Sequence, residues 1–147
     1  MYINTANLVT VESVGPAQGT AFEEYAKGKN LFLTGAAGTG KTFILLHLAL
    51  KEVLEKSTPY DKVVLIRSLL PSRDIGFLPG TLDEKSNLYQ DPYRILVRYL
   101  FQMPNEQEFQ MLYDKLVGQG SLEFYSTSFL RGQTFDRSII IVDEAQN

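Results

Sequence analysis

The sequence contains no cysteine and no tryptophan, and it has a single histidine among 147 residues. Without cysteine the chain can form no disulfide, no thiolate nucleophile and no zinc site that uses sulfur. One histidine also excludes metal sites built from several imidazoles. This histidine, His47, lies in an apolar segment with no catalytic partner near it in sequence, so we expect it to serve packing.

The chain also lacks an excess of positive charge and a long hydrophobic run. Its 14 basic and 17 acidic side chains give a net charge of −3, so the overall charge does not favour nucleic-acid binding, although a local basic groove stays open. No apolar run approaches the roughly 20 residues of a membrane-spanning helix. The opening MYINTANLVTVES has no basic region before an apolar stretch, and so no signal-peptide pattern. We therefore expect a soluble, cytoplasmic protein with no membrane partner.

The pattern of apolar segments predicts one α/β domain over residues 1–147, with a mainly parallel sheet flanked by helices. No repeat or linker indicates a second domain. Residues 1–18 lack periodicity and are expected to form an extended lead-in with a turn at Gly15-Pro16. Helices are expected from a capping box at Thr20 and Glu23 to Gly28, over 42–56, from Asp91-Pro92 to about 102, and over 105–117. Strands are expected at 31–33, 63–66, 122–126 and 138–143, the last of these buried.

The segment GAAGTGKT, residues 35–42, matches the phosphate-binding pattern G-x-x-x-x-G-K-[ST] between an expected strand and a helix start. Its glycines allow a tight backbone turn whose N–H groups approach phosphate oxygens, and the helix N-terminus adds free donors and positive charge. Lys41 can reach the β- and γ-phosphates, and the Thr42 hydroxyl can bind Mg²⁺. The candidate nucleotide-binding residues are therefore Gly35, Ala36, Ala37, Gly38, Thr39, Gly40, Lys41 and Thr42.

A pair of acidic residues directly after the apolar segment 139–142 forms a second candidate site. Asp143 and Glu144 would emerge at the C-terminal edge of a parallel sheet, where ligands bind in such folds. We expect Asp143 to hold Mg²⁺ through a water and Glu144 to polarise the attacking water, so that Lys41 and Glu144 are the catalytic candidates. Adjacent carboxylates repel each other unless a cation lies between them, which favours Mg²⁺ here.

Aromatic side chains gather with two arginines in the segment 89–99. Tyr89, Tyr93 and Tyr99 accompany Arg94 and Arg98, which lie four residues apart on one expected helix face. Such a patch can stack single-stranded bases. Core packing beside a solvated face explains the same pattern and is favoured.

Five segments together resemble one known family: GAAGTGKT, VVLIRS, DIGFLPG, STSFLRG and IIIVDEAQN. In this order they resemble the PhoH-like, phosphate-starvation-inducible P-loop ATPases, most of all the short bacteriophage members, over residues 30–147. The resemblance implies a core like that of superfamily 1 helicases, with ATP and Mg²⁺ as cofactors, ATP hydrolysis and a role in RNA metabolism. A phage-encoded protein would act in the host cytoplasm.

The resemblance also implies roles for residues outside the two motifs. Gln146 falls where helicase-like ATPases couple the nucleotide site to other parts, and Gln18 where they read adenine. Arg67, Arg73 and Arg131 fall in or near the intervening motifs, where they face phosphate or nucleic acid or are plain surface arginines.

Members of the family continue beyond DEAQN to a sensor segment, and in related ATPases the sensor strand lies between the P-loop strand and the strand of the two acids. We therefore expect a gap between residues 31–33 and 139–142, marginal stability, and turnover barely above background. A nucleotide-dependent binding module with little turnover is the alternative function, and a small P-loop kinase is a weaker one. Single-stranded RNA and a second copy of the chain are candidate partners.

Overall fold

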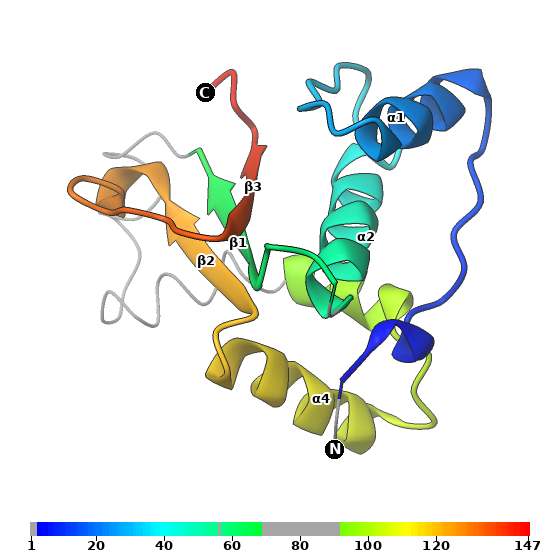
Figure 1. Ribbon diagram of the computed structural model, residues 1–147, viewed down its shortest axis with the longest axis vertical. Helices are drawn as coiled ribbons and strands as arrows, with labels where there is room; N and C mark the ends of the chain where they lie inside the picture. Colours follow the sequence, from blue (N-terminus) through cyan, green and yellow to red (C-terminus); the bar gives the residue numbers. More distant parts are fainter. Residues whose placement is uncertain (1–2, 56, 69–91) are drawn as a thin grey trace.

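A three-stranded parallel sheet forms the centre of the computed structural model, which describes residues 3–55, 57–68 and 92–147. Its strands are β1 (Lys62–Arg67), β2 (Leu122–Ser126) and β3 (Ser138–Asp143), in the order β2-β1-β3 (Figure 1). In the register of the sheet Val63 lies opposite Leu122 on one side and Ile139 on the other. The expected α/β class with a parallel sheet is confirmed.

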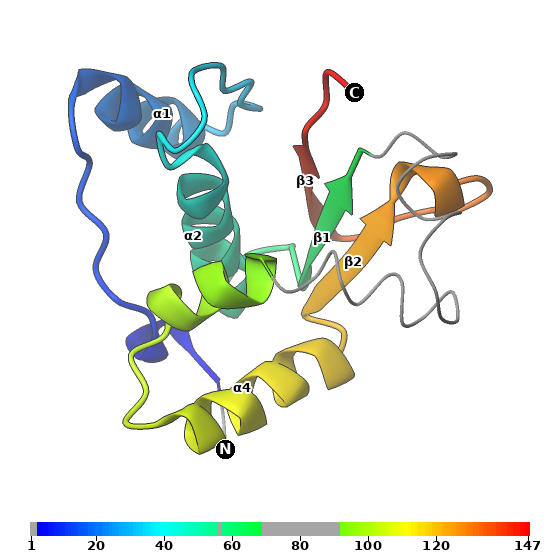
Figure 2. The ribbon, with the colours of Figure 1, turned by 180° about the vertical axis from the view of Figure 1, so that it is seen from behind.

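Helices surround this sheet. They are α1 (Pro16–Ala26), α2 (Lys41–Leu54) and α4 (Glu106–Gly118), with helical residues at 92–100 and 3₁₀ turns η1 (Thr5–Asn7) and η2 (Thr127–Phe129). Helix α2 packs against β1 and β3, while α4 contacts β2 (Figures 1 and 2). No helix in the described ranges combines the length and apolar character needed to cross a bilayer.

The core lies between the sheet and these helices. Strand β1 is buried at all four central positions, 63–66, as its run of β-branched and apolar residues predicts for a central strand. Fully buried side chains from α2, α4 and residues 92–100 meet it: Leu46, Leu50, Phe109, Leu112, Val97 and Leu100. This packing holds the C-terminal ends of β1 and β3 in place.

The start of the chain differs from the expectation. Helix α1 begins at Pro16, not at Thr20, because proline suits the first helical position and Gly15 precedes it with φ 98°. Thr20 does not cap a helix, since its hydroxyl donates to the Pro16 carbonyl at 3.0 Å. The expected lead-in over residues 1–18 is also not wholly extended, because η1 lies within it and α1 begins at Pro16.

The expected strand at 31–33 was also wrong. These residues are in no strand, and Phe32 is 85% exposed. Consequently β3 is an edge strand among the described residues, and its outward side chains Ile140 and Val142 are each 48% exposed rather than buried. Short apolar runs become strands only when a neighbouring strand accepts their hydrogen bonds.

The remaining expected elements are largely confirmed. Helix α4 begins after Asn105, whose side chain accepts the Glu108 N–H at 2.9 Å, and it ends at Gly118. Residues 92–100 are helical, while Asp91 lies outside the described residues.

Candidate functional site

The segment 35–40 forms a loop between the extended residues 31–34 and the start of α2. Gly38 (φ 77°) and Gly40 (φ 84°) have left-handed backbone conformations, which residues with a side chain rarely adopt. Gly40 is the N-cap of α2, so the first backbone N–H groups of that helix face the loop. The free donors and positive helix end make this loop suited to an anion.

Lys41 lies over this loop. Its ammonium donates to the carbonyls of Gly35 (2.9 Å) and Ala36 (2.7 Å) and lies 3.3 Å from the Thr39 hydroxyl. A phosphate bound at the loop would replace these acceptors with oxygens of full negative charge, which bind an ammonium more strongly. The loop therefore holds the Lys41 ammonium where a bound phosphate would lie.

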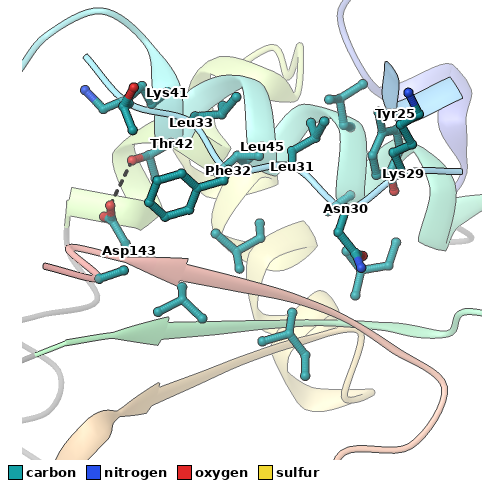
Figure 3. Close-up of a pocket in the computed structure, with 18 of the residues that line it drawn as sticks. Tyr25, Lys29, Asn30, Leu31, Phe32, Leu33, Lys41, Thr42, Leu45 and Asp143 are labelled. Carbon is teal, nitrogen blue, oxygen red and sulfur yellow. Dashed lines mark hydrogen bonds between the residues drawn. The ribbon is translucent and has the colours of Figure 1, made fainter. Parts of the chain in front are cut away.

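The two motifs meet at Thr42 and Asp143. The Thr42 hydroxyl donates to Asp143 Oδ1 at 3.3 Å, although the residues are 101 positions apart (Figure 3). Asp143 is the last residue of β3, so its carboxylate emerges at the C-terminal edge of the sheet, as expected. A hydroxyl and a carboxylate are the hard oxygen ligands that Mg²⁺ prefers, so the donor set fits this ion. In the described ranges no three His, Cys, Asp or Glu side chains cluster, and Mg²⁺ commonly takes one or two protein oxygens plus phosphate.

Asp143 has a further partner that sequence reasoning missed. The hydroxyl of Tyr93, in the first turn of helical residues 92–100, donates to Asp143 Oδ2 at 2.8 Å. Burial and the neighbouring Asp143 raise the pKa of this phenol above its usual value, so it stays a donor. The sequence offered only a tyrosine in an aromatic cluster, with nothing to connect positions 50 residues apart.

Glu144 follows Asp143 with a left-handed backbone, φ 54°, which is uncommon for a residue with a side chain. Its N–H donates to Asp143 Oδ1 at 3.0 Å, and its carbonyl accepts the Asn147 N–H at 3.0 Å. The Glu144 side chain is exposed, and Gln146 Nε2 donates to it at 2.5 Å. Asp143 and Glu144 both line the cleft beside the loop.

Gln18 also reaches the loop. Its Nε2 donates to the Thr39 carbonyl at 3.3 Å, and its Oε1 accepts the Val14 N–H at 2.7 Å. The structure therefore places Gln18 beside the phosphate loop, from the first turn of α1.

The three arginines named from the sequence, Arg67, Arg73 and Arg131, do not lie together at the loop in the described residues. Arg67 ends β1 directly opposite Asp143 in the register of the sheet and is half-buried. Arg131 is exposed on the segment after η2, and no interaction found in the described ranges joins it to the loop. Arg73 lies outside the described residues.

Arg94 and Arg98 serve packing rather than a free basic surface. Both pair with Glu106, Arg98 at 3.4 Å, and both lie over the Phe109 ring at 5.0 and 5.2 Å. Glu106 offsets one of the two positive charges, and the two arginines hold the pKa of its carboxyl below the usual range. His47 is likewise buried, edge-on to Phe22, as expected.

A cleft of about 930 Å³ runs along β3, between this strand and the segment 28–35. It ends at Lys41, Thr42 and Asp143, and Phe32 points from the extended segment toward β3 (Figure 3). The cleft coincides with the gap expected between residues 31–33 and 139–142.

Comparison with known proteins agrees with this geometry. The family model described as PhoH-like protein matches residues 10–147. The chain is 37% identical over 119 residues to Protein PhoH of Escherichia coli (strain K12), covering 80% of this chain and 31% of that protein. It is 35% identical over 116 residues to Protein PhoH2 of Bacillus subtilis (strain 168), covering 78% of this chain and 25% of that protein. It is 36% identical over 119 residues to the PhoH-like protein of Mycobacterium leprae (strain TN), covering 80% of this chain and 31% of that protein. The chain thus spans about a quarter to a third of the length of these relatives.

Proposed function

The chain belongs to the PhoH-like protein family of nucleotide-binding P-loop proteins, and on that premise we propose that its site binds ATP with Mg²⁺ and hydrolyses it. The phosphate loop would bind the β- and γ-phosphates through residues 35–42, with Lys41 supplying the positive charge. Bound Mg²⁺ would neutralise charge that develops on the phosphates.

The observation that carries the proposal is the contact between Thr42 and Asp143. Their oxygens lie 3.3 Å apart, beside the loop that ends at the N-terminus of α2. One cation can bind near both oxygens while phosphate lies on the loop, which is how P-loop proteins hold Mg²⁺ and nucleotide together. A glycine-rich turn with an accidental lysine would not require a carboxylate at this place.

The proposed roles of the two acids follow from their positions. Asp143 is fixed by three donors and faces Thr42, so it holds the metal. Glu144 is exposed on its left-handed turn, so its carboxylate can accept a proton from a water that attacks the γ-phosphate. Gln18 would contribute to nucleotide binding, while Arg67 and Gln146 would couple the site to partners.

A second candidate function is nucleotide binding with little turnover. The contact from Gln146 to Glu144 favours it, because an acceptor already occupied by an amide is a weaker base for water. The ATP site would then act as a ligand-dependent switch for binding.

Action on single-stranded RNA and assembly with a second copy are proposals for the whole protein. The family resemblance supports the first, and neither Arg94 nor Arg98 adds to it, because Glu106 engages both.

Two measurements on the 147-residue chain test the proposed function. Titration with a fluorescent ATP analogue, with and without Mg²⁺, is expected to give saturable, Mg²⁺-dependent binding. Phosphate release is then measured with and without single-stranded RNA. Release above background supports an ATPase, binding without release supports the second candidate, and absence of binding contradicts both.

A further inference from the structure

Tyr93 joins the hydrophobic core to the metal-binding edge of the sheet. Its side chain is only 3% exposed, and its ring lies 6.1 Å from the ring of Phe124 on β2. The packed ring leaves the phenol little freedom, so its hydroxyl is held where the core places it. That place is 2.8 Å from Asp143 Oδ2.

The carboxylate of Asp143 receives different donors at its two oxygens. Oδ2 accepts the Tyr93 hydroxyl, while Oδ1 accepts the Glu144 N–H at 3.0 Å and the Thr42 hydroxyl at 3.3 Å. A carboxylate torsion is broad and soft when nothing restrains it. A charge-assisted O–H···O⁻ bond to a buried donor is strong enough to restrain it.

We propose that Tyr93 is a positioning residue for the metal site: its hydroxyl fixes Asp143 Oδ2 so that Oδ1 faces Thr42, where Mg²⁺ would bind. The proposal rests on the proposed function, in which Asp143 serves Mg²⁺. Partners that orient a metal-binding side chain typically contribute 10- to 100-fold to metal affinity. The helix at 92–100 thereby becomes part of the nucleotide site, although none of its residues belongs to either sequence motif.

Replacing Tyr93 by phenylalanine removes the hydroxyl and keeps the buried ring. The readout is the Mg²⁺ concentration that gives half of the Mg²⁺-dependent gain in binding of the fluorescent ATP analogue. Tyr93→Phe is expected to raise this concentration about 10-fold or more, while the affinity at saturating Mg²⁺ changes little. Tyr125→Phe is the matched control. It also removes a phenol hydroxyl that bonds a carboxylate, but this carboxylate is that of Glu123 on β2, 3.3 Å away, and not part of the site.

A double-mutant cycle separates positioning from a structural effect. If Tyr93 acts through Asp143, Tyr93→Phe has no further effect on the Mg²⁺ requirement in an Asp143→Asn background. Equal Mg²⁺ requirements for Tyr93→Phe and the unaltered chain, or a shift that persists with Asp143→Asn, would overturn the proposal. A Tyr93→Phe chain that no longer melts cooperatively would also overturn it, since the hydroxyl would then serve the fold. Mg²⁺-independent binding by the unaltered chain would instead contradict the proposed function.

Discussion

Gln18 Nε2 lies 3.3 Å from the Thr39 carbonyl, so the first turn of helix α1 is hydrogen-bonded to the middle of the phosphate loop. The same amide accepts the Val14 N–H through its oxygen. Both ends of the Gln18 side chain are therefore engaged with backbone. The adenine-reading role that the family resemblance implies stays a prediction.

Gln18→Ala tests what this amide does. Loss of the bond to Thr39 frees the loop, so ATP affinity is expected to fall several-fold, in line with about 0.5–1.5 kcal/mol for one hydrogen bond. Titration with ATP and GTP analogues distinguishes the two roles. The two backbone bonds favour an equal loss for both nucleotides, whereas a loss confined to ATP would assign the amide to the base.

Lys41→Ala is expected to weaken binding of the ATP analogue about 10- to 100-fold, because it removes the cation that lies over the loop. The matched control is Lys51→Ala, which removes an exposed lysine from the same helix. Unchanged affinity in Lys41→Ala would contradict the site assignment.

The two acids are expected to give different defects. Glu144→Gln should keep Mg²⁺-dependent binding and slow phosphate release about 10²- to 10⁴-fold, the usual contribution of a general base. Asp143→Asn should instead weaken the Mg²⁺ dependence of binding itself. Titration and phosphate-release assays on both variants check this, and exchanged phenotypes would mean that the roles are reversed.

His47 predicts a dependence of stability on pH. Burial, and then the charge of Lys51, lower its pKa in the folded state from the ordinary 6.5. Below about pH 6.5 the unfolded chain therefore takes up a proton that the folded chain resists, so the free energy of unfolding falls as the pH falls. Thermal melts from pH 7.5 to 5.5 should show a smaller decline in His47→Leu, which cannot titrate. Parallel declines would contradict this.

Mg-ATP is expected to stabilise the chain strongly for its size. Among the described residues β3 is an edge strand, on which Ile140 and Val142 are each 48% exposed, and the expected marginal stability stays a prediction. Nucleotide at about 100 times its Kd adds about 2.7 kcal/mol, which raises the melting temperature by about 5–10 °C for a domain of this length. Calorimetry with and without Mg-ATP measures the shift, and Lys41→Ala at the same nucleotide concentration should show little of it.

The sequence by itself determined the phosphate loop, helix α2 and the three strands that form the sheet. These depend on local properties: glycines that accept left-handed backbones, an apolar helix, and runs of β-branched residues. It also placed Asp143 at the C-terminal end of a strand, because a parallel sheet brings such ends to one edge.

Only the tertiary structure decided which residues complete the site, and that the apolar segment 31–33 remains outside the sheet. Tyr93 reaches Asp143, and Gln18 reaches Thr39, because packed helices bring together positions that no sequence period relates. The segment 31–33 has the composition of a strand, yet a strand needs a partner for its backbone groups, and β3 lies across a cleft from this segment. Pairing and packing are properties of neighbours in space, so local sequence could not fix them.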